Sequence, residues 1–177
     1  VVLPAAPNFA PLLAESYAWH EEYLTDERNH SQYDPVTLGR LLDAGAVSTT
    51  EYIRAQQELL RTRHLINDVF DEVDVLVTPT APGLPERIDQ AINPSQANTA
   101  EPSTRNTAPF NLYGIPTISV PIGFSTSGLP GLPGLPGLPG LPIGLQISSA
   151  HLGEEVMFSL AHAFQQATDW HTETPAI

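Results

Sequence analysis

The hydrophobic and polar positions in the first 70 residues follow helical periods. Residues 8–25 alternate apolar and polar side chains in a loose helical pattern. Residues 34–45 begin with an aspartate N-cap and a proline and end with glycine, which predicts a short helix. Residues 48–51 form a capping box, so a long amphipathic helix is expected to follow and to end near Phe70. The apolar face of that helix recurs at spacings of three and four residues: Tyr52, Ala55, Leu59, Thr62, Ile66 and Val69.

The rest of the chain contains short apolar runs that are typical of buried strands. Three strands are predicted over Val73–Val77, Pro116–Pro121 and Ile143–Ser148, and residues 1–4 form a short strand-like opening. The helices before these strands and a closing helix after them predict an α/β fold with a mostly buried sheet. The apolar face expected for the closing helix consists of Val156, Leu160, Ala163, Phe164 and Ala167.

Two segments show neither the helical period nor the apolar pattern of a strand. Residues 81–102 are rich in proline and polar side chains, which predicts a long surface excursion rather than a new domain. Residues 128–142 repeat Gly-Leu-Pro five times. Glycine at every third position suits a collagen triple helix, but the stretch is short and would need three chains in register. Because closing a loop costs only about 0.6 kcal/mol more for each doubling of its length, we interpret the repeat as a loop insertion between two strands.

Composition and charge narrow the classes of protein to which the chain can belong. Its 177 residues suffice for one packed domain, and no apolar run approaches the roughly 20 residues that span a bilayer. The net charge of −13 gives the surface no attraction for nucleic acid or anionic membranes. Cysteine is absent, which excludes disulfides, thiolate nucleophiles and cysteine metal sites. We expect a soluble protein, cytoplasmic by default, with no direct nucleic-acid or membrane partner.

Four segments carry a resemblance to a known family. They are Val73–Thr80, Arg105–Pro121, Gly140–Gln146 and the closing stretch Leu160–His171. In order and spacing they resemble the C-terminal portion of the amidase signature family, which includes amidases like the A subunit of glutamyl-tRNA(Gln) amidotransferase. The family pattern has a single Gly-Leu-Pro before the last strand. The four extra triplets are therefore a departure of this sequence, which favours the loop insertion.

The resemblance implies a fold and a reaction. Amidases of this family have a mixed, twisted sheet with helices on both sides, and they hydrolyse carboxamides to a carboxylate and ammonia or an amine. Their triad is a nucleophilic serine, a second serine in a cis peptide and a lysine, which acts as the base. All seven basic residues of this chain are arginine, and no glycine- and serine-rich stretch is present, so no catalytic residue is assigned. We expect residues 1–177 to be the C-terminal part of a single amidase domain, inactive without its N-terminal catalytic half.

Three residues are candidates for contacts with a small-molecule amide substrate. Thr80 follows the first predicted strand, and ligands gather at the carboxyl ends of strands in α/β folds. The resemblance implies that the loop at Asn111 is a pocket wall. Arg40 lies where some relatives that accept an acidic substrate carry an arginine able to bind a carboxylate. The alternatives are a turn cap for Thr80 and Asn111 and a surface ion pair for Arg40.

The remaining polar groups have structural interpretations. The pair Ser148–Ser149 ends a predicted strand without flanking glycines, so we interpret it as structural rather than nucleophilic. His162 and His171 are nine residues apart, and His20–Glu22 lacks a second histidine, so neither forms a zinc motif. The acidic residues within 68–74 are interpreted as a solvated edge. We expect no metal and no cofactor.

Two functions stay open at this point. The first is a portion of an amidase that contributes sheet and pocket walls. The second is a non-catalytic binding or assembly module that uses the Gly-Leu-Pro arm. Each large apolar side chain left in water forfeits about 1.5–3 kcal/mol, so the first function predicts that the isolated chain is marginally stable and prone to aggregate.

Overall fold

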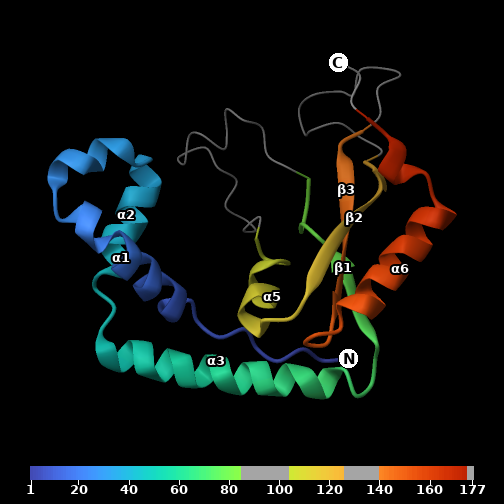
Figure 1. Cartoon of the computed structure of the whole chain (residues 1–177), viewed down its shortest axis with the longest axis horizontal. Coiled ribbons are helices and arrows are strands. Elements are labelled where there is room, and N and C mark those ends of the chain that lie inside the picture. The colour runs from blue at the N-terminus through green and yellow to red at the C-terminus, as the bar shows by residue number, and fades with distance from the viewer. Residues whose placement is uncertain (85–103, 126–139, 175–177) are drawn as a thin grey trace. The chain divides into compact units, whose positions relative to one another are not determined.

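The computed structural model describes residues 1–84, 104–125 and 140–174, and the chain divides into two compact units (Figure 1). We call residues 3–65 the helical unit, and residues 1–2 with 66–177 the sheet unit. Most of the Gly-Leu-Pro repeat and of the predicted excursion lie outside the described residues. Their predicted conformations therefore stay predictions.

The helical unit contains the helices that the periodicity predicts. Helix α1 spans Ala10–Leu24, the 3-10 helix η1 spans Glu27–Gln32, and α2 spans Pro35–Ala44. Helix α3 spans Thr49–Val69 and ends within the sheet unit. The helices α1, α2 and α3 confirm the sequence analysis, whereas the mostly polar η1 was not predicted because it shows no apolar period.

Capping and close packing explain the boundaries of α2. The Asp34 carboxylate accepts hydrogen bonds from the N–H groups of Val36 at 3.0 Å and Thr37 at 3.1 Å, so it satisfies two N–H groups that the helix leaves free. At the other end, a Cβ on Gly45 would lie 2.8 Å from the ring of Tyr17. Glycine therefore allows α1 and the end of α2 to approach closely.

Helix α3 buries the face predicted for it. The Ser48 hydroxyl accepts a hydrogen bond from the Glu51 N–H at 3.2 Å, which confirms the N-terminal cap. Of the six predicted face positions, Tyr52 is half-buried and the other five are buried. Those five are Ala55, Leu59, Thr62, Ile66 and Val69.

The described strands of the sheet unit form one antiparallel sheet in the order β1-β3-β2. Strand β1 spans Val75–Pro79, β2 spans Thr117–Phe124 and β3 spans Pro142–Ser149. All three correspond to predicted strands, although β1 begins later than Val73 because residues 71–74 form a turn and a bend. The prediction of a strand-like opening was wrong, since residues 1–4 adopt no strand. The sheet is also less buried than expected, because β1 is half-buried or exposed along its length.

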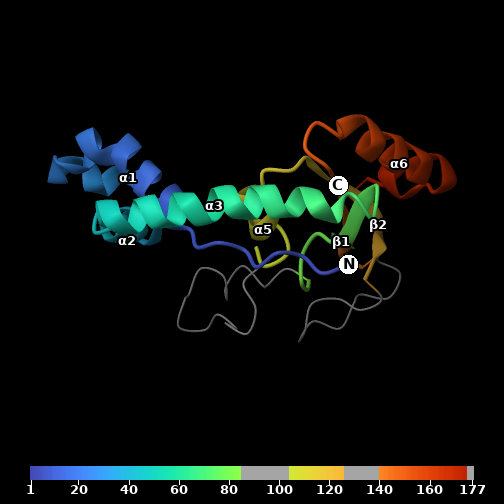
Figure 2. The same ribbon diagram turned by 90° about the horizontal axis from the view of Figure 1, so that it is seen from below.

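Helix α6, which spans Glu154–Ala167, covers one face of this sheet beside β2 and β3 (Figure 1, Figure 2). The core of this layer consists of four buried side chains, Val120, Ile147, Met157 and Ala161, with half-buried neighbours that include Phe164. The predicted apolar face of α6 was therefore wrong except for Phe164. The residues that face the sheet lie one helical step from the predicted ones, because α6 is apolar on two adjacent faces and periodicity alone cannot choose between them.

Two short helices flank the sheet. Helix α5 spans Ala108–Tyr113 and ends at Gly114, which adopts a left-handed conformation with φ 69° that favours glycine. The 3-10 helix η2 spans Trp170–Thr172, and the Trp170 ring meets the Phe124 ring edge to face at 6.1 Å. The sequence analysis predicted neither helix. With six and three residues, the two helices are too short to show a helical period in the sequence.

Candidate functional site

The face of the sheet opposite α6 is polar. Leu145 and Ile147 of β3 belong to the layer beneath α6, so Gln146 and Ser148 point to the other face. The antiparallel register pairs Gln146 with Thr78 and Ser119, which brings side chains from all three strands to that face. We call Thr78, Thr80, Asn106, Ser119 and Gln146 the polar site.

Two hydroxyl groups meet above the central strand. Thr80 Oγ1 lies 2.6 Å from Ser119 Oγ, and the Thr80 N–H donates to the Gly144 carbonyl at 2.9 Å. A Cβ on Gly144 would lie 2.7 Å from both hydroxyl oxygens. The absence of a side chain at Gly144 thus allows Ser119 of β2 to contact Thr80, the residue after β1. Ser119 is exposed and Thr80 is half-buried, so the pair is accessible to solvent.

A buried amide anchors the segment that precedes α5. The Gln146 side chain is 2% exposed, and its Nε2 donates to Thr78 Oγ1 at 3.1 Å and to the Asn106 carbonyl at 3.0 Å. Asn106 in turn donates from its Nδ2 to the Pro79 carbonyl at 3.0 Å. The Pro79 carbonyl and the Thr80 N–H belong to the same trans peptide, so they point in opposite directions. Because the Thr80 N–H points to β3, the Pro79 carbonyl points to the outer edge of β1. The Asn106 amide therefore caps the end of that edge.

The serine pair at the end of β3 is structural, as the sequence analysis proposed. Ser148 and Ser149 are 0% and 1% exposed. The Ser148 hydroxyl lies 2.8 Å from that of Thr117, and the Ser149 hydroxyl donates to the Gly153 carbonyl at 2.7 Å. Both hydroxyls are thus used within the fold and are shielded from a substrate.

The three predicted substrate residues have different surroundings. Thr80 belongs to the polar site. Asn111 lies on α5 with an exposed side chain, five residues after Asn106, which anchors the approach to that helix. Arg40 is exposed on α2 of the helical unit, which is described separately from the sheet unit. The structure therefore places Thr80 and Asn111 in one unit and gives no position for Arg40 relative to them.

Sequence reasoning missed Asn106, Ser119 and Gln146. Ser119 and Gln146 lie inside strands predicted from their apolar content, and a polar residue in such a strand is a signal because burial of an unpaired polar group is costly. That signal could have identified Gln146. The role of Asn106 depends on a contact 40 residues along the chain, which no local pattern contains.

The chemistry of the polar site is that of neutral hydrogen-bonding groups. Its members are hydroxyls and carboxamides, none of which is a base at neutral pH. They can orient a neutral polar ligand, but a serine hydroxyl without a base is a weak nucleophile. Nearby on α5, burial raises the pKa of Tyr113 above its ordinary value.

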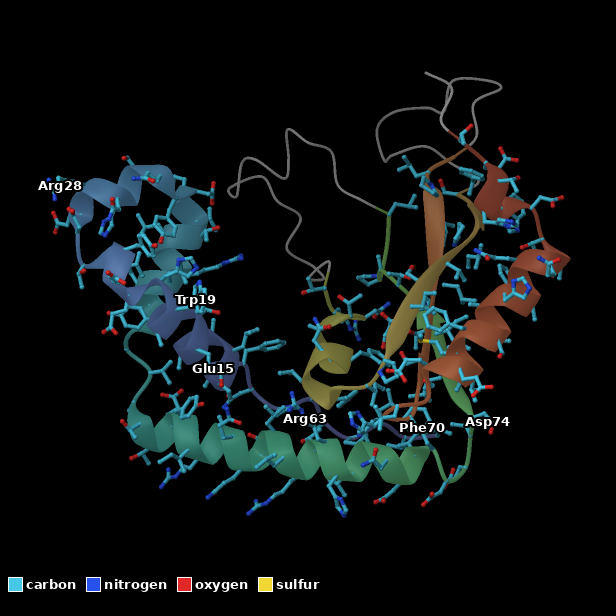
Figure 3. All side chains as sticks on the ribbon, viewed as in Figure 1. Glu15, Trp19, Arg28, Arg63, Phe70 and Asp74 are labelled. Atoms are coloured by element: carbon cyan, nitrogen blue, oxygen red, sulfur yellow. The ribbon has the colours of Figure 1, made fainter. Side chains whose placement is uncertain are left out.

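The helical unit contains an ion pair between Arg28 and Asp26. The Arg28 guanidinium holds the pKa of the Asp26 carboxyl below its usual value. Asp26 is the N-cap of η1, and Arg28, which lies in that helix, is labelled in Figure 3. Among the described residues, no three histidine, cysteine, aspartate or glutamate side chains are grouped as metal ligands. The helices of the described part of the chain also lack the combined length and apolarity of a membrane span.

Comparison with known proteins identifies related sequences. The family model for amidases matches residues 10–158. The A subunit of glutamyl-tRNA(Gln) amidotransferase from Listeria innocua is 35% identical over 159 residues, which are 88% of this chain and 30% of that protein. The same subunit from Methylococcus capsulatus is 37% identical over 134 residues, which are 71% of this chain and 23% of that protein. The chain thus spans less than a third of the length of these relatives.

Solved structures give the same assignment of the fold. The chain is similar to 6-aminohexanoate cyclic dimer hydrolase with a TM-score of 0.70 and 21% identity, over 94% of this chain and 34% of that one. A bacterial aryl acylamidase of the amidase signature family gives a TM-score of 0.64 and 26% identity, over 90% of this chain and 32% of that one. Sequence and fold together show that the chain belongs to the amidase signature family.

Proposed function

We propose that this chain forms the C-terminal part of an amidase domain that hydrolyses small carboxamides to a carboxylate and ammonia or an amine. In this proposal residues 1–177 belong to one domain, with the Gly-Leu-Pro repeat at about 128–142 as a loop insertion. The chain contributes the three-stranded sheet and a wall of the substrate pocket. Its partner is the N-terminal part of the same domain, which carries the catalytic groups.

The observation that carries this proposal is the absence of lysine from a member of the amidase signature family. All seven basic residues are arginine. A guanidinium stays protonated at any pH at which proteins fold, so it cannot accept a proton from a serine hydroxyl. The serine pair of β3 is buried and hydrogen-bonded, which leaves it unsuited to attack a substrate. The isolated chain is therefore proposed to be inactive.

The polar site supports a role in binding. An amide substrate presents a carbonyl acceptor and N–H donors, and the accessible hydroxyls of Thr80 and Ser119 can pair with either. Asn111, whose side chain is exposed on α5, offers a carboxamide to the same kind of group. Arg40 would instead bind a carboxylate on the substrate, if the complete site brings α2 close to the pocket. A net charge of −13 argues against direct contact with nucleic acid.

The alternative function as a binding or assembly module depends on the Gly-Leu-Pro arm. Most of that arm lies outside the described residues, so no described contact favours the alternative. The polar site, by contrast, is built from described residues of all three strands and the turn before α5.

Ammonia release from a panel of simple aliphatic and aromatic amides tests the proposal. We compare the isolated chain with an extended polypeptide, in which Val1 is preceded by the residues encoded upstream in the same gene. The proposal expects activity in the extended polypeptide alone. Activity in the isolated chain would contradict it, and so would inactivity of an extended polypeptide that contains a lysine and a glycine- and serine-rich stretch.

The pocket residues are tested in the active extended polypeptide. Thr80→Val removes a hydroxyl with little change of shape, and Asn111→Ala and Arg40→Ala remove the other candidate contacts. Each is expected to raise KM by about tenfold, the equivalent of one lost hydrogen bond. Thr50→Val, at an exposed position of α3, is the control and should leave KM unchanged. A residue whose variant keeps the original KM does not belong to the pocket.

A further inference from the structure

Helix α6 has an apolar face that nothing in the described structure covers. Its inner face, with Met157 and Ala161, packs on the sheet. Beside that face lie Val156 at 46% exposure and Leu160 at 39% exposure, together with exposed alanines. We call these positions the outer stripe: Val156, Leu160, Ala163 and Ala167.

The spacing of the outer stripe is that of a helix-packing seam. Its members are separated by four, three and four residues, so they lie along one side of the helix. The two alanines at the C-terminal end permit another element to approach the backbone closely. No member of the stripe is charged, and the flanking residues Ser159 and Gln166 are uncharged as well. In a chain with a net charge of −13, such a stripe is suited to an apolar neighbour rather than to water.

A second exposed apolar side chain lies on the same face of the sheet. Val77 pairs in register with Ile147, so its side chain points to the face on which α6 packs. Helix α6 packs on β2 and β3, whereas Val77 belongs to β1 and is 49% exposed. The layer that covers Ile147 is therefore incomplete at the neighbouring strand.

The lengths of the relatives indicate what completes this layer. The match to 6-aminohexanoate cyclic dimer hydrolase, with a TM-score of 0.70, includes 94% of this chain but only 34% of that enzyme's chain. The match to the Listeria innocua relative includes only 30% of that protein. In those proteins, the matched part is embedded in a polypeptide about three times as long. A face that remains apolar and exposed in this part is a natural place for the rest of such a domain to pack.

We propose that the outer stripe of α6 and Val77 form the surface against which the remaining part of the amidase domain packs. This inference rests on the proposed function, since it assigns a contact surface to the partner named there. The occupant is an apolar element of that remaining part. A second copy of this chain is the competing occupant, and the experiment distinguishes the two.

The absence of cysteine makes the surface measurable by thiol labelling. We introduce Leu160→Cys or Ala163→Cys on the outer stripe, in the isolated chain and in the extended polypeptide, and measure the rate of reaction with a maleimide. The control is His162→Cys. His162 is exposed and lies about 200° round the helix from Leu160, which turns it away from the stripe.

The proposal expects both stripe variants to react rapidly in the isolated chain and at least about tenfold more slowly in the extended polypeptide, which corresponds to about 1.4 kcal/mol of protection. The His162→Cys control should react at the same rate in both. Equal rates at the stripe in the two proteins would overturn the proposal. Protection in the isolated chain that grows with its concentration would assign the stripe to a second copy instead.

Ammonia release from the same samples separates this inference from the proposed function. An active extended polypeptide with unprotected stripe residues would refute the surface and leave the function standing. An inactive extended polypeptide with protected stripe residues would refute the function and leave the surface standing. Two different stripe positions are used because a local disturbance at one of them would not reproduce at the other.

Discussion

The hydroxyls of Thr80 and Ser119 lie 2.6 Å apart above β3, the strand between β1 and β2. Thr80 follows β1 and Ser119 lies in β2, while β3 runs between them. The contact exists because Gly144 of β3 has no side chain at the crossing point. The polar site therefore depends on one glycine for its shape as well as on its polar residues for its chemistry.

Gly144→Ala is expected to destabilise the chain. Its new Cβ would meet both hydroxyl oxygens at 2.7 Å, so the pair must separate or the strands must shift. Overpacking of this kind costs about 1–3 kcal/mol, which urea unfolding measures. The control is Gly39→Ala on α2, where a Cβ meets nothing within 4 Å and should add about 0.5–1 kcal/mol of stability. Equal stability of the Gly144→Ala variant and the wild type would contradict the geometry.

Gln146→Glu is expected to destabilise the sheet unit in a way that depends on pH. The carboxylate cannot donate to Thr78 or to the Asn106 carbonyl, and it would be charged at a position that is 2% exposed. Removal of these donors costs about 1–3 kcal/mol at neutral pH, and the buried charge adds to that cost.

The loss in Gln146→Glu should shrink as the pH falls, because a protonated carboxyl is neutral and regains one O–H donor. Urea unfolding at neutral pH and near the pKa of glutamate measures the difference. Gln57→Glu, at an exposed position of α3, is the control and should stay within about 0.5 kcal/mol of the wild type. A loss independent of pH would contradict the prediction, because it would mean that the buried charge contributes nothing and that the lost N–H donors account for the whole effect.

The local patterns of the sequence were sufficient for most elements of this fold. The Asp-Pro start of α2 and the capping box of α3 involve neighbours within three residues, so their outcome could be predicted. The face of α6 could not, because Val156 and Met157 are both apolar and only the position of the sheet decides which is buried. The register that brings Gln146 to Thr78 is likewise a tertiary contact, 68 residues along the chain.

The candidate site was predictable only in part for the same reason. Thr80 was predicted because it follows a strand, which is a local property. Ser119 and Asn106 join it through contacts between distant segments, and the alternation within β2 and β3 does not show what lies above each face. The family resemblance supplied Asn111 and Arg40, whose contacts with a substrate stay predictions.

Ile147→Ala and Val77→Ala are expected to differ strongly although the two residues are partners in the sheet. Ile147 is 0% exposed beneath α6, so its truncation leaves a cavity and should cost about 2–5 kcal/mol. Val77 is 49% exposed in the same chain, and its truncation should cost less than about 1 kcal/mol. Urea unfolding of the isolated chain measures both. Similar losses for the two variants would mean that Val77 is covered in solution.

Tyr113→Phe is expected to change how stability depends on alkaline pH. Burial disfavours the phenolate and raises the pKa of Tyr113 above about 10, its value in the unfolded chain. The folded state therefore keeps a proton that the unfolded state loses, so this contribution is complete below the unfolded pKa and is lost as the pH rises through the folded pKa. Wild-type stability should fall with pH in that window, and Tyr113→Phe should remove part of the fall.

Urea unfolding from about pH 8 to about pH 11 measures this slope for the two proteins, and phenolate absorbance reports the titration itself. The comparison uses the slopes and not the absolute stabilities, since the substitution can also change packing on α5. Tyr23→Phe, at a side chain that is 61% exposed on α1, is the matched control and should keep the wild-type slope. If Tyr113→Phe also keeps that slope, then the phenol of Tyr113 ionises as easily in the folded chain as in water, and Tyr113 is less buried in solution than the structure describes.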